Sequence, residues 1–276
     1  VAIREGYLDL VKASITGSII GNLLLVLGFS MLLGGAKHGI QKFDRNQATN
    51  HSILLTLAVL ALAIPSFFSS YIGSEKSTGV EILSLGVAGV MIVLYVLGII
   101  FSLKTQSSPL AYSPEKQKQD NHLMSKKAAF ILLAFATGCV VWLSEVLVGS
   151  VEGVVENLGL SEFFLGIILI PVIGNVSEHL VAVQVARRNM MDLSVEIAIS
   201  SSLQIALLVA PVLVFVSLIM GNPLTLIFNT FELMALGAAV VITVLVANDG
   251  ESNWLEGAAL LAVYLILGLA FFMLPA

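Results

Sequence analysis

The chain has 276 residues, of which 58% are hydrophobic and 11% are charged, and its mean hydropathy is +1.00. Soluble domains carry roughly 25% charged residues, so this composition excludes an ordinary soluble fold. The net charge is −5 and the single cysteine, Cys139, lies in an apolar segment, where we expect a packed thiol. We expect no nucleic-acid partner and no cofactor.

Apolar runs of about 20 residues, each long enough to cross a bilayer as a helix, recur along the whole chain. The pattern predicts eight spans, at residues 9–33, 52–72, 80–103, 128–149, 162–186, 192–219, 224–247 and 254–274. The fold class is therefore an all-α polytopic membrane protein. A polar loop, 104–127, divides the chain into a first part, 1–103, with three spans, and a second part, 128–276, with five.

The basic residues are distributed unevenly between the two sides of the membrane. Ten of the thirteen lie in alternate loops on one side: Lys37, Lys42, Arg45, Lys104, Lys116, Lys118, Lys126, Lys127, Arg187 and Arg188. The positive-inside rule makes this side cytoplasmic, including the loop 104–127. The loop 150–162 has three Glu and no Lys or Arg, and falls outside. We expect a multi-pass protein in the lipid bilayer of a prokaryotic plasma membrane.

Two segments of the sequence resemble each other. With one gap, "REGYLDLVKASITGSIIGNLLLV" at 4–26 aligns with "RRNMMDLSVEIAISSSLQIALLV" at 187–209, which pairs Ser18 with Ser202. The predicted topology gives the copies opposite orientations, a recurrent construction of secondary transporters. We therefore expect two inverted five-helix repeats, with the first one incomplete and lacking two spans before Val1.

Polar side chains interrupt the fifth predicted span. The stretch "PVIGNVSEHL" places Asn175, Glu178 and His179 on one face of a helix, since residues three and four apart share a face. An ionised carboxylate at this depth costs at least about 2.5 kcal/mol, so Glu178 should face a cavity or a partner. Pro171 and Gly174 should kink the helix and free carbonyl oxygens. Such oxygens suit a hard cation such as Ca²⁺, which takes about six to eight oxygen ligands.

Other interpretations of these side chains stay open. Asn175 could form a hydrogen bond between helices, and a structural hydrogen bond explains His179 as well as proton handling does.

Two further spans carry polar residues near their middle. "ISSSLQIALLVAP" contains Ser202 and Gln204, and "ASITGSIIGN" contains Ser18 and Asn22. Serines in membrane helices often bond only to their own preceding turn, which is the alternative for each of them. One line of side chains at intervals of four residues is formed by Glu196, Ser200 and Gln204.

The same first span contains a pair of small residues. Gly17 and Gly21 are four residues apart and favour close approach of a neighbouring backbone. The carboxylates of Glu81, Glu145 and Glu232 lie near predicted helix ends, where water should solvate them.

These segments carry a family resemblance. "GNVSEH" after "IILIPVI", followed by "ISSSLQIALLVAPVLV", resembles the second repeat of the calcium/proton antiporters, within the cation/calcium exchanger superfamily. "VKASITGSIIGNLLLVLGFSMLLGG" is similar to the second helix of their first repeat. The resemblance covers nearly the whole chain and is weakest over 35–127. It implies inverted five-helix halves around a midplane site for Ca²⁺ and H⁺.

The resemblance also implies roles for individual residues. The implied metal ligands are Glu178, Asn175, Ser202, Gln204, Ser18 and Asn22. The implied proton carriers are Glu178 and His179. The acidic motif of the first repeat would fall about six residues before Val1, so we expect only half of the carboxylate pair in this chain.

The expected mechanism is electrostatic. Two facing carboxylates can bind one Ca²⁺ or be protonated, and either loaded state carries little net charge, whereas the empty ionised state is costly in a medium of low dielectric. Crossing is then easier with the site loaded than with it empty, which predicts exchange of Ca²⁺ for H⁺.

Three alternatives differ in class or in the coupled ion. A Na⁺/Ca²⁺ exchanger would use similar site chemistry. An intramembrane hydrolase built on Ser177, Glu178 and His179 is geometrically poor, because adjacent helical residues point about 100° apart, although Ser202 could pair with His179 across helices. A structural membrane subunit would not explain polar stripes in both repeats. We therefore predict a transporter and not an enzyme.

Overall fold

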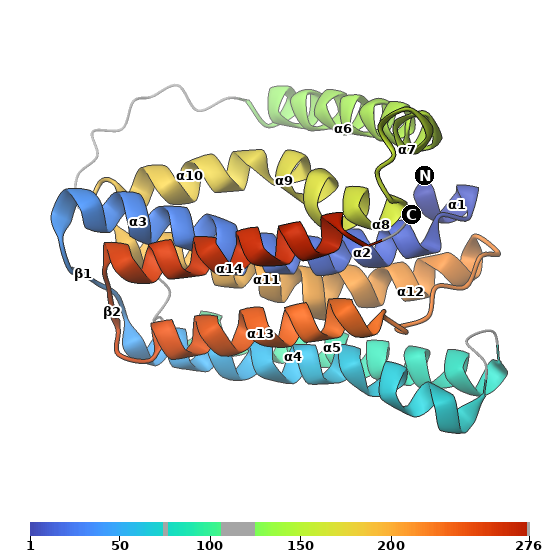
Figure 1. Ribbon diagram of the computed structural model, residues 1–276, viewed down its shortest axis with the longest axis horizontal. Helices are drawn as coiled ribbons and strands as arrows, with labels where there is room; N and C mark the ends of the chain where they lie inside the picture. Colours follow the sequence, from blue (N-terminus) through green and yellow to red (C-terminus); the bar gives the residue numbers. More distant parts are fainter. Residues whose placement is uncertain (74–76, 106–124, 275–276) are drawn as a thin grey trace.

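The computed structural model describes residues 1–73, 77–105 and 125–274, and nearly all of its regular structure is helical (Figure 1). The elements of the first part are α1 (Ala2–Glu5), α2 (Leu8–Ile20), η1 (Gly21–Val26), α3 (Leu27–His38), β1 (Gln41–Lys42), α4 (Arg45–Ile72) and α5 (Thr78–Thr105), where η marks a π-helical segment. The elements of the second part are α6 (Lys126–Gly149), α7 (Val151–Leu158), α8 (Glu162–Phe164), η3 (Leu165–Leu169), α9 (Ile170–Gly174), α10 (Val176–Ala186), α11 (Met191–Gln204), η4 (Ile205–Val209), α12 (Ala210–Ile219), α13 (Thr230–Ala247), β2 (Glu251–Ser252) and α14 (Trp254–Phe272).

The number of spans agrees with the prediction. Among the described residues, seven helices are long and apolar enough to cross a membrane. The segments Glu162–Gly174 and Val176–Ala186, bent by 58° relative to each other, pass the same test when they are taken together. This pair, called the broken helix below, brings the number of spans to eight. Most of the polar loop 104–127 lies outside the described residues.

Several helix boundaries differ from the prediction because side chains cap the helix starts. α4 begins at Arg45 and not at residue 52, since the carboxylate of Asp44 accepts hydrogen bonds from two backbone N–H groups of the first turn. α13 begins at Thr230 and not at residue 224, because Asn229 and Glu232 form a capping box. The acidic segment 150–162 is not a plain loop, as it contains helix α7.

Both copies of the internal repeat contain a π-helical segment at the same place. η1 begins at Gly21 and η4 begins at Ile205, and these two residues are as far apart in sequence as Ser18 and Ser202. Each copy thus forms one long helix of the type α–π–α, namely α2–η1–α3 and α11–η4–α12. Single π-helical turns within α-helices often mark functional sites.

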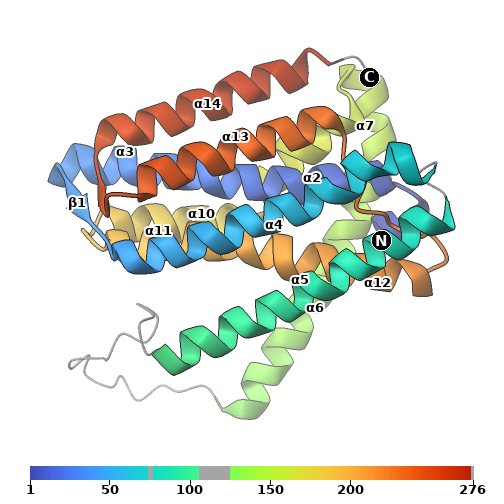
Figure 2. The same cartoon turned by 90° about the horizontal axis from the view of Figure 1, so that it is seen from below.

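The packing of the helices follows the internal symmetry. The two long helices lie side by side at the centre of the bundle, with η1 against α11 and α2 against η4 (Figures 1 and 2). α14 packs along α3, and in the corresponding way α5 packs along α12. α13 packs against α2 and α4 packs against α11. Thus α13 and α14 pack against the first long helix as α4 and α5 pack against the second. This correspondence confirms an architecture of inverted repeats.

The centre and the edge of the bundle differ in burial. In the α2–η1–α3 helix, 72% of the most apolar 18-residue window is buried inside the protein, compared with 6% in α6. Figure 2 shows α6 projecting from the bundle, and Figure 1 shows it on the side opposite to α5. The first copy of the repeat therefore forms the core, and α6 exposes its apolar side chains at the edge of the bundle.

The loops at one end of the bundle hold basic residues and are joined to each other. β1 and β2 pair in antiparallel orientation, which ties the α3–α4 connection to the α13–α14 connection. Lys37 donates a hydrogen bond to the carbonyl of Arg187, across the end of α10. This end, on the left in Figure 1, is called the Lys/Arg-rich end below.

Candidate functional site

The candidate site is positioned by the crossing of α2 over the broken helix. Pro171 has no N–H that could bond to the carbonyl of Ile167 four residues earlier. The oxygen of Ile167 lies against the Cα of Gly17 in α2, where any Cβ would overlap it. Gly166 lies in the same way against the side chain of Ala13. The two backbones can approach this closely only because both positions are glycine.

The predicted glycine pair is therefore only half correct. Gly17 packs against a neighbouring backbone, but a Cβ at Gly21 would meet no atom within 4 Å. Gly21 is instead the first residue of the π-helical segment η1.

Asn175 divides the broken helix into its two halves. Its backbone angles, φ −102° and ψ 13°, lie near the bridge region, where many active-site residues are found. The kink expected from Pro171 and Gly174 is thus present, with the break at the next residue. Because α10 begins directly after the break, Glu178 falls in its first turn. The free N–H groups and the dipole of a helix start stabilise negative charge there.

Three buried side-chain nitrogens near this break have no hydrogen-bond partner among the described residues. They are Nδ2 of Asn22, Nδ2 of Asn175 and Nε2 of His179. An unpaired buried polar group costs about 1–3 kcal/mol, so its presence requires an explanation. The elements that carry these groups are in contact, since η1 packs against α10 and α2 packs against α9. Unsatisfied polar groups of both repeats therefore lie on elements that pack against the two halves of the broken helix or belong to it.

Glu178 has a different environment from these buried groups. Its side chain is exposed, and within the described part of the chain no donor or cation contacts its carboxylate. Since an ionised carboxylate facing lipid is costly at this depth, water or protein must cover this face in the membrane. The partner that we expected for Glu178 is therefore not found among the described residues.

The remaining predicted ligands differ in how they are engaged. Ser202 is fully buried and donates a hydrogen bond to the carbonyl of Ala198 at 2.9 Å, which is the local bond that serines often form. Its oxygen keeps acceptor capacity. Gln204 is exposed at the last position of α11, and Ser18 is half-buried in α2.

The described residues contain no group of three or more His, Cys, Asp or Glu side chains that could hold a metal ion. Any cation bound at this place therefore needs amide and hydroxyl oxygens besides the carboxylate of Glu178. Across the described ranges, no hydrogen bond joins Ser202 to His179, so the pairing that a hydrolase requires is absent there.

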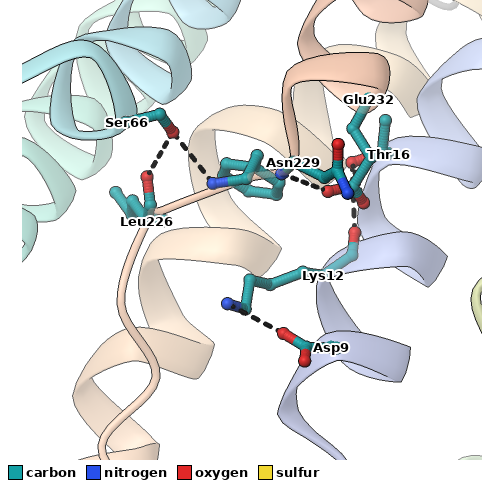
Figure 3. A network of polar contacts seen from close by, with 8 residues as sticks. Asp9, Lys12, Thr16, Ser66, Leu226, Asn229 and Glu232 are labelled. Carbon is teal, nitrogen blue, oxygen red and sulfur yellow. Dashed lines mark hydrogen bonds and ion pairs between the residues drawn. The ribbon is translucent and has the colours of Figure 1, made fainter. Parts of the chain in front are cut away.

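Glu232 is not the solvated helix-end carboxylate that we expected. It is 3% exposed, and its Oε2 accepts a hydrogen bond from the backbone N–H of Asn229 at 2.7 Å. The hydroxyl of Thr16 lies 3.4 Å from its Oε1, and Lys12 forms an ion pair with Asp9 at 3.1 Å beside it (Figure 3). A cavity of about 690 Å³ adjoins this network at the end of the bundle opposite to the Lys/Arg-rich end.

Sequence reasoning also missed the surroundings of Glu196. The carboxylate is buried between α11 and α4, where Gln47 and His51 contact it. The regular spacing of Glu196, Ser200 and Gln204 was visible in the sequence, but the partners on α4 lie almost 150 residues away and carry no signal of their own.

Comparisons with known proteins identify the family. The family model described as sodium/calcium exchanger protein matches residues 1–104 and 128–273. The chain is also 45% identical over 294 residues to a protein named Ca²⁺/H⁺ antiporter from Aphanothece halophytica, covering 100% of this chain and 77% of that protein. The chain belongs to the sodium/calcium exchanger family.

Two further proteins support the exchanger fold and the similarity of this chain to Ca²⁺/H⁺ antiporters. The chain is 41% identical over 278 residues to the Ca²⁺/H⁺ antiporter ChaA of Bacillus subtilis, covering 99% of this chain and 78% of ChaA. The solved structure of native YfkE superposes with a TM-score of 0.85 at 40% identity, covering 99% of this chain and 78% of YfkE. The predicted exchanger fold is thereby confirmed.

Proposed function

We propose that this protein is a secondary transporter that exchanges Ca²⁺ for H⁺ across the membrane at the broken helix. The observation that supports the proposal is the break at Asn175, after which the exposed Glu178 lies in the first turn of α10. Asn175 and His179 on this helix, and Asn22 of the first repeat, carry side-chain nitrogens without a partner among the described residues. The similarity to proteins named Ca²⁺/H⁺ antiporter at 41–45% identity supports the choice of ions.

The proposed ligands supply two kinds of oxygen, charged and neutral. Glu178 supplies the negative charge, and the amide oxygens of Asn175 and Asn22 supply neutral ligands for a cation that prefers oxygen. Their Nδ2 groups then donate hydrogen bonds to carboxylates or to water that accompanies the ion, which accounts for their lack of protein partners. The oxygens of Ser18, Ser202 and Gln204 complete the proposed set. No cofactor is required, because Ca²⁺ and H⁺ are the transported substrates.

Proton binding is assigned to the same carboxylate. A proton on Glu178 removes the charge that holds Ca²⁺, so the two ions exclude each other. His179 follows Glu178 directly, and its unpartnered Nε2 can accept or release a proton. Either loaded form lowers the charge that must cross the low-dielectric region, whereas the empty ionised form does not cross.

The experiment is uptake of radioactive Ca²⁺ into liposomes that contain the protein, driven by a pH gradient in the absence of Na⁺. Glu178→Gln keeps the size of the side chain but cannot ionise, and it should abolish uptake. Glu162→Gln is the matched control, because Glu162 is also an exposed first-turn carboxylate of the broken helix, and it should retain uptake. Uptake that persists in Glu178→Gln, or that requires a Na⁺ gradient, contradicts the proposal.

A further inference from the structure

A second buried carboxylate lies away from the candidate site, toward the Lys/Arg-rich end. Glu196 of α11 is 8% exposed, and its Oε2 accepts a hydrogen bond from Nε2 of Gln47 at 2.7 Å and lies 3.3 Å from Nδ1 of His51. Its Oε1 accepts a hydrogen bond from the hydroxyl of Ser200 at 2.9 Å. These four residues, the Glu196 cluster, join α4 to α11 and contain two groups that bind and release protons.

His51 connects the Glu196 cluster to the surface. Its side chain lines a cavity of about 300 Å³ between α4 and α5, together with the exposed residues Asn46 and Asn50. It also lines, with Glu196, a space of about 10 Å³ between α4 and α11. The imidazole therefore stands between a polar cavity that reaches the surface and a buried carboxylate.

Ser200 connects the same carboxylate to the interior. Glu196, Ser200 and Gln204 follow one another at intervals of about one turn along α11, from its middle to its last residue. Gln204 is one of the proposed ligands, so this polar line leads from the surface cavity toward the candidate site.

The opposite end of the bundle lacks this arrangement at the corresponding positions. The internal repeat aligns Glu196 with Lys12 and Ser200 with Thr16. Lys12 forms an ion pair with Asp9, so a cationic side chain occupies the place equivalent to Glu196 (Figure 3). The two ends therefore differ at the position of Glu196, although Thr16, which aligns with Ser200, also contacts a buried carboxylate, that of Glu232.

We propose that the Glu196 cluster is the route by which protons pass between the Lys/Arg-rich side of the membrane and the candidate site. This inference rests on the proposed function, and it adds His51, Glu196 and Ser200 as proton-transfer groups that do not bind Ca²⁺. Gln47 is a positioning residue, because its amide holds Oε2 toward the imidazole.

A proton passes through the cluster in successive transfers, from His51 to Glu196 and then to Ser200. His51 takes a proton from water in the surface cavity at Nε2 and releases the proton at Nδ1 to Oε2 of Glu196, which returns the imidazole to its neutral form. The protonated carboxyl group of Glu196 then rotates so that its O–H faces Ser200, and it donates this proton to the serine oxygen. At the same time the hydroxyl proton of Ser200 passes to a water molecule on the side of Gln204, which carries it on as hydronium. The reverse order carries a proton outward.

Other titratable groups lie on α11 and on the elements packed against it. Asp192 lies one turn before Glu196 and accepts a hydrogen bond from the backbone N–H of Asp44, and both of these residues line the same small space as His51 and Glu196. The further charged or titratable side chains on these elements are Arg45 on α4, Lys37 and His38 on α3, Lys42 on β1, Glu178 and His179 on α10, and Asp9 and Lys12 on α2. Of these, Lys37 and His38 contact the carbonyl of Arg187, and Lys42 pairs with Glu251.

The test uses Glu196→Gln, since the single oxygen of glutamine can accept the hydrogen bond from Gln47 and its NH2 group can donate to the hydroxyl oxygen of Ser200, but the amide cannot carry a proton. Glu251→Gln is the matched control, because Glu251 is a carboxylate at the same end that pairs with Lys42 outside the cluster. Three quantities are measured for each protein: Ca²⁺ binding in detergent, the thermal unfolding midpoint, and the initial rate of pH-gradient-driven uptake as a function of pH.

We expect Glu196→Gln to lower the uptake rate by roughly a hundredfold, the low end of what a positioned proton-transfer group contributes, and to flatten its pH profile. Its Ca²⁺ affinity and unfolding midpoint should match those of Glu251→Gln. His51→Gln should lower the rate less, because water in the surface cavity can reach the carboxylate more slowly on its own.

Two results would overturn the inference. If Glu196→Gln transports as fast as Glu251→Gln with the same pH profile, the cluster does not carry protons. If Glu196→Gln loses Ca²⁺ binding and thermal stability together with transport, the cluster is a structural link between α4 and α11. Both results leave the proposed function standing as long as Glu178→Gln abolishes uptake, whereas absence of uptake by the unmodified protein overturns both proposals.

Discussion

The carbonyl oxygen of Ile167 lies against the Cα of Gly17, and this contact sets how closely α2 approaches the broken helix. The broken helix carries Asn175 and Glu178, and α2 leads directly into the segment that carries Asn22. Gly17, together with Gly166 on the broken helix, therefore sets the spacing between the two halves of the candidate site.

Substitution of Gly17 should disturb the whole crossing. In Gly17→Ala the new methyl group meets the backbone of Ile167, which cannot move aside like the end of a side chain, so we expect a loss of about 1–3 kcal/mol in stability. Gly21→Ala is the matched control four residues later, where the methyl group meets no atom within 4 Å. Thermal unfolding in detergent compares the two, and equal midpoints would show that the contact is not restrictive.

Substitution of Asn22 should change stability and Ca²⁺ affinity in different directions. Asn22→Leu keeps a similar volume and removes a buried Nδ2 that has no partner among the described residues. We expect unchanged or higher stability, by up to about 1–3 kcal/mol, because the cost of the unpaired group disappears. Ca²⁺ affinity should fall at least about tenfold, the effect of losing roughly 1.4 kcal/mol from a ligand.

Calorimetric Ca²⁺ titration and thermal unfolding of Asn22→Leu give both quantities. A destabilised variant that binds Ca²⁺ normally would make this amide a structural group and remove it from the site.

The start of α4 depends on one side chain. Asp44 accepts hydrogen bonds from the backbone N–H groups of Asn46 and Gln47, so Asp44→Ala should cost about 1 kcal/mol of stability. Asn is an equally good cap, and Asp44→Asn should therefore stay close to the unmodified protein. Unfolding midpoints test this, and an equal loss in both variants would point to the charge of Asp44 instead of its hydrogen bonds.

The sequence contained enough information for the spans but not for all of their boundaries. Hydropathy alone separates eight apolar segments, because the bilayer demands long runs without charge. The starts of α4 and α13 were misplaced by several residues, although Asp44 and the Asn229–Glu232 pair are recognisable capping signals. Those signals lie in polar stretches, which a prediction based on apolar runs alone leaves outside the spans.

Part of the candidate site could be predicted from the sequence, for a related reason. Asn175, Glu178 and His179 stand out because polar groups are costly inside a span, and Pro171 and Gly174 predict a bend, which the structure places at Asn175. The burial of Glu232 and the contact of Glu196 with His51 could not be predicted, because each depends on which distant helix packs alongside.

The central claim is that Ca²⁺ and protons compete for Glu178, and proton release during Ca²⁺ binding tests it most directly. In weakly buffered detergent solution with a pH indicator, we expect Ca²⁺ to release protons from the unmodified protein and its apparent Kd to rise as pH falls, by about tenfold per pH unit for each proton displaced. Glu178→Gln should show neither binding nor release. Ca²⁺ binding that is independent of pH, or that is unchanged in Glu178→Gln, would contradict the account.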